Sequence, residues 1–392
     1  MSRAIYLLLV LALMARILLA LLTPLYDDPE VIPYFNDERA HFNYVRYVAQ
    51  TWWLPEQKSS VQDGFERAEY EYYQAPLYYL LASPYYSLGK RLTPGWELLW
   101  VRLVSVLFSM AGLTILYLAA RRFFPKGGLP LNLLFLAAFS GVPLRFGALV
   151  TNDSLLFALV CLYFALIFHL LTVKCDLRLL IAAALIAAAG LWTKASFILL
   201  LPLLPWALLR RPNCSIWKAA GSLLIPLAAT LPLYLRNYSL YGRFIPLEVG
   251  SGSADSIVFD SVLTRIFTTA NYFVRSLVFP YDGLWGGSLD KLVYPFEGLL
   301  FLVLIIAGFC YLLKRYKPVF WMFLAAIILS VCAYLNFSAR FFQSEARLLM
   351  PAFPFILTLL ALGAWQITGK KKNRAILLLG FWVLLPWVGA MV

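Results

Sequence analysis

The sequence predicts an all-α membrane protein that crosses the bilayer many times. Hydrophobic residues make up 62% of its 392 residues, charged residues make up 14%, and the mean hydropathy is +0.77. A soluble globular chain is about one-quarter charged. Long apolar runs recur along the chain, and the charges between them sort by side. These three observations together indicate a polytopic helical protein whose main surroundings are lipid.

The apolar runs define about eleven membrane-spanning helices. The first run follows Arg3 and resembles a signal peptide, but no small-x-small cleavage pattern follows it, so we expect a retained helix. The predicted spans are 4–25, 97–120, 129–149, 154–173, 178–193, 195–209, 215–235, 296–313, 318–338, 347–368 and 374–392.

The basic residues predict the orientation. They gather in short connectors at 121–126, 174–178, 210–218, 314–317 and 370–374. With the N-terminus inside and the C-terminus outside, every one of these connectors lies in the cytoplasm, as the positive-inside rule requires. Of the 20 acidic residues, all but Asp176 then fall on the outer side. The net charge of +13 therefore reflects orientation in a bilayer, and we expect no nucleic-acid partner.

Two long loops lie on the outer side, at 26–96 and 236–295. Within the first, residues 76–90 are apolar but short, interrupted by Pro84 and rich in tyrosine, which favours a helix lying on the membrane surface. Within the second, residues 261–279 have the pattern of an amphipathic surface helix. We expect residues 1–392 to form a single transmembrane domain without a soluble C-terminal domain.

An acidic pair, Asp37 and Glu38, follows the first span. Acidic residues beside a bilayer cost free energy, so their presence here indicates a candidate functional site. His41 lies four residues after Asp37, so one helix face can present both side chains to a site. A carboxylate there can deprotonate an acceptor hydroxyl or hold a divalent cation. The alternative is that Asn36 caps a helix and the acids complement its positive end.

Two further candidates lie at outer turns. Asp153 is part of a Thr-Asn-Asp-Ser sequence, which is also a good helix cap. Lys194 joins two short spans, whose length of roughly 22–24 Å is less than a hydrocarbon core of about 30 Å. A lysine at that depth needs an anionic partner such as a lipid phosphate. The alternative is that its side chain reaches up to the headgroups.

Arginines at the outer rim complete the candidate set. Arg236 and Arg347 have forked donors that match phosphate oxygens, although each alone is more typical of an interface anchor. His41 and Glu345 are candidates for contact with an acceptor, a sugar or a metal ion. No Cys/His metal cluster is present in the sequence, so a divalent cation is permitted but not required.

Taken in order, these motifs resemble the membrane glycosyltransferases of the GT-C fold, which include protein O-mannosyltransferases, the lipid A aminoarabinose transferase and oligosaccharyltransferases. The resemblance covers most of the chain as a series of short motifs. They are Asp37-Glu38, the Pro-Leu-Tyr-Tyr at Pro76, Arg102, Asn152-Asp153, Lys194, Arg236-Asn237, Tyr241-Gly242 and the Ala-Arg-Leu-Leu-Met-Pro ending at Pro351.

The resemblance implies transfer of a sugar from a polyprenyl-phosphate donor to a lipid, glycan or protein acceptor, with inversion. It places the active site on the extracytoplasmic face of the plasma membrane, as part of cell-envelope synthesis. By position, the resemblance implies that Asp37 is the catalytic base or the residue that orients the acceptor, and that Glu38 and Asp153 assist it. The donor phosphate is expected on three cations, which are Lys194, Arg236 and Arg347.

The sequence also permits two other classes of protein. A transporter or lipid flippase also needs polar groups within the membrane, but predicts charges near mid-span and discontinuous helices. In this chain the polar residues gather on one side, apart from Arg16 and His169. A membrane scaffold without chemistry needs its acidic loops only for solvation.

Overall fold

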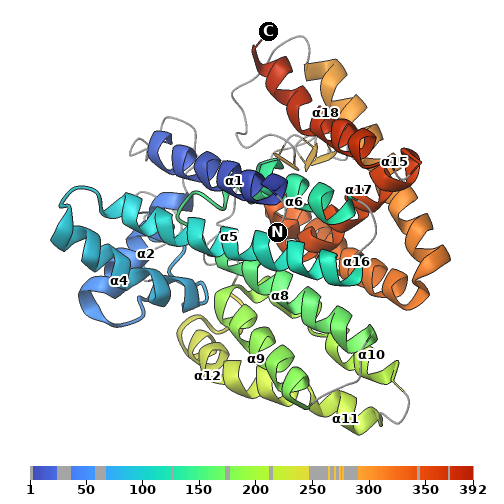
Figure 1. Cartoon of the computed structure of the whole chain (residues 1–392). Coiled ribbons are helices and arrows are strands. Elements are labelled where there is room, and N and C mark those ends of the chain that lie inside the picture. The colour runs from blue at the N-terminus through green and yellow to red at the C-terminus, as the bar shows by residue number, and fades with distance from the viewer. Residues whose placement is uncertain are drawn as a thin grey trace. The chain divides into compact units, whose positions relative to one another are not determined.

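The computed structural model describes most of the chain, and every regular element in that part is a helix (Figure 1). The prediction of an all-α protein is therefore confirmed for these residues. They are 3–23, 37–57, 68–124, 128–172, 177–211, 215–246, 264, 269–270, 273–274, 276–277, 290–341, 345–369 and 371–391.

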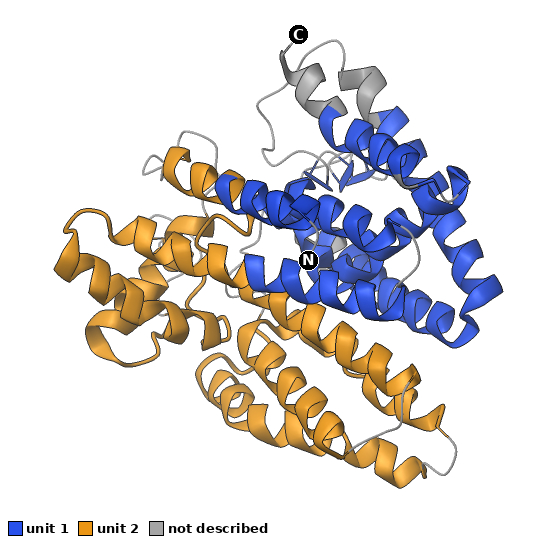
Figure 2. Cartoon of the chain, in the orientation of Figure 1, with its two compact units in different colours: residues 1–14, 110–145, 257–392 blue, residues 15–109, 146–256 orange. Residues whose placement is uncertain are grey.

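The helices group into two compact units (Figure 2). Unit 1 comprises Met1–Met14, Met110–Arg145 and Ile257–Val392, and unit 2 comprises Ala15–Ser109 and Phe146–Ser256. Helices α1 (Arg3–Leu22) and α5 (Glu97–Phe123) supply residues to both units. A single domain over 1–392 stays a prediction.

Unit 2 contains the N-terminal acidic pair and the first cationic candidates. Its helices pack in a chain of neighbours in which α2 contacts α4, α4 contacts α8 and α9, and α9 contacts α12. Their bounds are α2 Asp37–Thr51, α4 Leu77–Leu92, α8 Asn152–Thr172, α9 Leu177–Thr193, η2 Ala195–Leu200, α10 Leu203–Leu209, α11 Ile216–Gly221 and α12 Leu224–Tyr241.

Unit 1 is built around α17 (Phe353–Ile367), which packs against α6, α15, α16 and α18. Every residue from 353 to 365 is buried, as expected for a helix that is apolar on all faces. The surrounding elements are α6 Leu129–Phe139, α7 Gly141–Arg145, α15 Asp290–Arg315, α16 Lys317–Phe341, η3 Ala346–Ala352 and α18 Lys372–Met391.

Helix α2 is amphipathic and buries one face on α4. Tyr44, Val45 and Val48 are fully buried and pack with Tyr79 and Ala82. Their spacing of three and four residues places them on one stripe, while polar residues occupy the other side of the helix. This packing fixes the start of α2, and with it the acidic pair, relative to α4.

Among the described residues, seven helices are long and apolar enough to cross a membrane, and four apolar segments are shorter. Each predicted span has a counterpart among them, but the count of eleven and the orientation stay predictions. The span predicted at 129–149 is interrupted, because Ser140 has an extended backbone (φ −68°, ψ 146°) that ends α6. Residues 195–209 begin as a 3₁₀ helix, and residues 215–235 are divided between α11 and α12.

The predicted surface helix at 76–90 is present as α4, which continues through Pro84. Its position on the membrane surface stays a prediction. The helix predicted at 261–279 lies largely outside the described residues, as does the proposed cap Asn36.

Candidate active site

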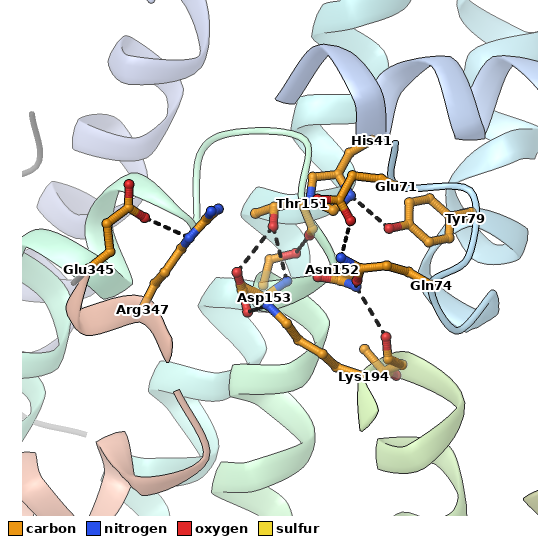
Figure 3. A network of polar contacts seen from close by, with 12 residues as sticks. His41, Glu71, Gln74, Tyr79, Thr151, Asn152, Asp153, Lys194, Glu345 and Arg347 are labelled. Carbon is orange, nitrogen blue, oxygen red and sulfur yellow. Dashed lines mark hydrogen bonds and ion pairs between the residues drawn. The ribbon is translucent and has the colours of Figure 1, made fainter. Parts of the chain in front are cut away.

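The first feature of the site is a salt bridge between Asp153 and Lys194 in unit 2. Asp153 lies in the first turn of α8, and Lys194 follows the last residue of α9 in an extended conformation (φ −158°, ψ 132°). The Lys194 Nζ atom is 2.6 Å from Asp153 Oδ1 (Figure 3). Asp153 is fully buried, whereas 21% of the Lys194 side chain is exposed. The lysine is therefore the member of the pair that a ligand can reach.

The cap predicted for α8 is present, but Thr151 provides it. The Asp153 N–H donates to Thr151 Oγ1 (3.3 Å), and the Thr151 hydroxyl donates to Asp153 Oδ2 (3.4 Å). Both Asp153 oxygens are thus engaged within the protein. In this geometry Asp153 is the counterion of Lys194, and a direct part in catalysis stays a prediction.

Asn152 holds the backbone beside Lys194. Its Nδ2 donates to the Thr193 carbonyl (3.2 Å) and to Gln74 Oε1. Neighbouring residues of α8 therefore fix both parts of the lysine: Asn152 its backbone and Asp153 its ammonium group. Asn152 Oδ1 is buried without a hydrogen-bond partner in the described part of the chain.

A polar chain continues from Asn152 to Glu71. Gln74 Nε2 donates to Glu71 Oε2, and the Gln74 carbonyl accepts the Tyr44 hydroxyl (3.2 Å). Glu71 is 8% exposed, and it lies in the loop between α2 and α4. The chain of donors, from Asn152 to Gln74 to Glu71, ends on a carboxylate. Neither Glu71 nor Gln74 was expected from the sequence.

Glu38 of the acidic pair is held in a buried ion pair. Its Oε1 accepts from Arg102 Nε (2.8 Å) and from the Val150 N–H (2.8 Å), and its Oε2 accepts from Arg102 Nη2 (2.6 Å). Arg102 Nη1 also donates to the carbonyls of Ala20 and Thr23, both at 2.7 Å. This cluster joins the ends of α1 and α2 to α5 and to the segment before α8. The geometry favours a structural role for Glu38, and its assistance in catalysis stays a prediction.

Asp37, the other acid of the pair, is only partly buried. Its Oδ1 accepts a hydrogen bond from the Tyr70 hydroxyl at 3.4 Å. Of the three predicted catalytic acids, Asp37 is the one that is not buried. Its neighbour Glu38 binds the Val150 N–H, three residues before Asp153, so the acidic pair and the salt bridge belong to one cluster of unit 2.

His41 faces Tyr79 and is nearly fully buried. Its Nδ1 is 2.7 Å from the Tyr79 hydroxyl, and Tyr79 stacks on Tyr44 with ring centroids 3.7 Å apart. Burial raises the pKa of the Tyr79 phenol well above its usual value. Burial also raises the pKa of Tyr44, although the nearby Arg236 guanidinium opposes that shift. Both phenols therefore stay neutral at physiological pH and act through hydrogen bonds.

Arg236 lies in the last two turns of α12, near Tyr44. Its Nη2 donates to the Pro55 carbonyl (2.7 Å) and more weakly to Leu54 (3.4 Å). Tyr241 supports the same segment by accepting the Gln57 N–H (3.1 Å). Arg236 thus belongs to unit 2 together with Lys194, and the path between them runs through Tyr44, Gln74 and Asn152.

Arg347 and Glu345 belong to unit 1. Arg347 Nε is 2.6 Å from Glu345 Oε2 (Figure 3). The start of η3 is fixed because the Ala346 N–H donates to Ser276 Oγ (2.7 Å). A shared phosphate site for Arg347 and the unit 2 cations stays a prediction.

Metal binding was predicted as permitted but not required. Within the described ranges, no three His, Cys, Asp or Glu side chains form a group that could hold a metal ion. His41 is engaged with Tyr79 and Glu345 with Arg347, so neither shows the geometry of a ligand cluster.

The chain is similar to known proteins in its three-dimensional structure. No protein-family model matches the chain, and no curated protein matches it. Among solved structures, ArnT from Cupriavidus metallidurans in the apo state superposes with a TM-score of 0.59 at 16% identity, over 92% of this chain and 59% of that one. ArnT bound to undecaprenyl phosphate gives 0.59 at 15% identity, over 95% and 62%.

An archaeal protein gives a similar match. The archaeal oligosaccharyltransferase AglB from Archaeoglobus fulgidus, in complex with an inhibitory peptide and a dolichol-phosphate, has a TM-score of 0.54 at 13% identity, over 98% of this chain and 55% of that one. The chain has the GT-C fold. It is an integral, multi-pass membrane protein that spans less than two-thirds of the length of these neighbours.

Asp37, Glu38, His41, Asp153, Lys194 and Arg236 all belong to unit 2, and of these residues the structure shows direct pairing between Asp153 and Lys194. Sequence reasoning missed Glu71, Gln74 and the pairing of Arg102 with Glu38. The only sequence signal for Glu71 and Gln74 is their position just before Pro76, in a polar stretch that enters an apolar helix.

Proposed function

We propose that the chain transfers a sugar from a polyprenyl-phosphate donor to an acceptor hydroxyl at the extracytoplasmic face of the plasma membrane. The observation that carries this proposal is the Asp153–Lys194 pair. It holds a partly exposed cation in the same unit as a partly exposed acid, Asp37. The ligands named for the structural neighbours, undecaprenyl phosphate and dolichol-phosphate, support a carrier of this class.

The cations bind and activate the leaving group. Lys194 keeps its contact with Asp153 and donates its remaining ammonium N–H groups to the donor phosphate, and Arg236 supplies further donors from α12. Arg347 is proposed as a third cation. As the bond between the anomeric carbon and the phosphate oxygen breaks, the electron pair passes to that oxygen. Fixed positive charge stabilises the polyprenyl phosphate that leaves.

Asp37 acts on the acceptor. Its carboxylate takes the proton from the acceptor hydroxyl while the oxygen attacks the anomeric carbon from the face opposite the phosphate. A new glycosidic bond forms as the phosphate bond breaks, so the configuration inverts. Glu38 and Asp153 contribute by holding α2 and Lys194 in place, and the fixed geometry lowers the entropic part of the barrier.

The test uses purified protein in proteoliposomes with a panel of radiolabelled polyprenyl-phosphate sugars and mixed lipid and glycan acceptors. The expected result is release of unglycosylated polyprenyl phosphate together with a labelled acceptor for at least one donor. Movement of intact donor between leaflets without cleavage would instead identify a flippase. Failure of the folded protein to bind polyprenyl phosphate at all rejects the proposal.

A further inference from the structure

A cavity of about 370 Å³ lies in unit 1 between the last turn of α15 and the end of α17. Its lining consists of Tyr311, Lys314, Arg315, Gln366 and Gly369. It therefore takes its two cations from α15 and a neutral amide from α17. None of these residues belongs to the candidate active site.

Close packing of α15 on α17 fixes the walls of this cavity. Gly308 faces the Leu359 carbonyl and Gly363 faces the Leu304 carbonyl, so closely that a β-carbon at either glycine would overlap the opposite backbone. Beyond this contact both helices end, α15 at Arg315 and α17 at Ile367. The two helix ends, which the sequence places on the same side of the membrane, therefore line one space.

The charge balance of the cavity favours an anion. Each helix C-terminus contributes about half a negative charge. Two such ends sum to about one negative charge, and Lys314 with Arg315 supply two positive charges. Complementing the helix dipoles therefore uses only about half of the cationic charge. No carboxylate is among the residues that line the cavity in the described part of the chain.

The position of the cavity narrows the choice of anion. Residues 295–315 and 346–367 are both apolar enough to cross a membrane, so the ends of these helices lie at the depth of lipid headgroups. Basic pockets between membrane helices are typical sites for anionic lipid headgroups. Tyr311 and Gln366 add a hydroxyl and an amide that can bond the ester and glycerol oxygens of such a headgroup.

We propose that this cavity binds the phosphodiester headgroup of an anionic phospholipid. Arg315 and Lys314 hold the phosphate oxygens, while the acyl chains lie along the outer surface of α15. The site is separate from the proposed sugar transfer and does not depend on it. Its chemical requirement, one phosphate with two cations, is shared with free inorganic phosphate, and the test distinguishes the two.

The test measures lipid retention by native mass spectrometry of the full chain, released from nanodiscs of phosphatidylglycerol and phosphatidylcholine in equal amounts. We expect wild type to retain phosphatidylglycerol preferentially. The double variant Lys314→Ala/Arg315→Ala should retain at least about tenfold less, because each cation near an anionic lipid contributes roughly a fivefold preference. Lys317→Ala is the matched control, since Lys317 is nearby in sequence but does not line the cavity.

A second variant separates cavity binding from general attraction. Gln366→Trp fills the space without changing charge, at a residue that is exposed, and should also lose the bound lipid. The proposal is overturned if Lys317→Ala loses as much lipid as the double variant, or if Gln366→Trp retains the wild-type amount. It is also overturned if inorganic phosphate displaces the signal fully at concentrations that leave the bilayer intact, because the site is then one for free phosphate.

Discussion

Lys194 Nζ lies 2.6 Å from Asp153 Oδ1, although the two residues are 41 positions apart in the sequence. The start of α8 and the end of α9 make a second contact, in which the Asn152 side-chain amide donates to the Thr193 carbonyl. The lysine is thus held at both ends by consecutive residues of α8. A cation held in this way can meet a lipid phosphate with little loss of side-chain entropy.

Removing Lys194 alone should destabilise the protein more than removing both charges of the Asp153–Lys194 pair. Lys194→Met leaves Asp153 buried without its counterion, and we expect a loss of up to about 3–5 kcal/mol in stability. Asp153→Asn/Lys194→Met should recover most of this loss. Thermal unfolding in detergent provides the measurement. Equal unfolding temperatures for wild type and Lys194→Met would show that the pair does not form.

Binding of polyprenyl phosphate distinguishes the same two residues in another way. Lys194→Met should bind undecaprenyl phosphate at least about tenfold more weakly, because it lacks a cation of the proposed phosphate site. Asp153→Asn keeps the positive charge of Lys194 but loses the salt bridge that holds it, so it should lose much less affinity than Lys194→Met. A folded Asp153→Asn protein that has lost binding would mean that Asp153 itself acts on the donor.

The Glu38–Arg102 cluster predicts a structural phenotype. Glu38→Ala removes the partner of a buried guanidinium and should cost about 3–5 kcal/mol. Glu38→Leu/Arg102→Leu should be more stable than either single change, because no unpaired charge remains. Circular dichroism during heating measures both. If Glu38→Ala unfolds at the wild-type temperature but is inactive, Glu38 has a catalytic role and not a structural one.

Asn152 should affect phosphate binding indirectly, because it fixes the backbone next to Lys194. Asn152→Asp cannot donate to the Thr193 carbonyl or to Gln74, and we expect weaker binding of undecaprenyl phosphate with a stability loss of about 1–3 kcal/mol. The control is Thr172→Ala, which changes a polar residue at the far end of the same helix. Unchanged lipid affinity in Asn152→Asp would remove Asn152 from the positioning of the lysine.

Much of this fold follows from the sequence, because its main signals are local. Apolar runs predict α5, α8 and α17, since a bilayer or a buried position demands them. The acidic pair and the helix start at Asn152 are likewise visible in a few adjacent residues. Partner choice is not local. Nothing near Glu38 indicates Arg102, which is 64 residues away, and nothing near Gln74 indicates Asn152.

The sequence also did not predict where an apolar run is broken into separate helices. The span predicted at 129–149 contains Ser140, Gly141 and Pro143, and each is tolerated within a membrane helix when neighbouring groups satisfy the backbone. Here α6 ends at Phe139 and α7 begins at Gly141. Tertiary packing decides between a kink and a break, and that information is spread over other helices.

Glu297 in α15 provides a test of how side-chain burial affects the stability of unit 1. It is fully buried, and neither carboxylate oxygen has a hydrogen-bond partner in the described part of the chain. A buried carboxyl without a partner costs free energy. Glu297→Leu should therefore raise the unfolding temperature, by a gain of about 1–3 kcal/mol. A lower unfolding temperature would indicate that Glu297 has a stabilising contact.

The most direct test of the central claim is single-turnover kinetics of Asp37→Asn with a donor that wild type uses. Asp37 is partly buried and is the proposed base, so the variant should keep the wild-type unfolding temperature and donor affinity. Its rate of polyprenyl phosphate release should fall by about 10²–10⁴-fold. A folded Asp37→Asn protein that releases polyprenyl phosphate at the wild-type rate would contradict the account.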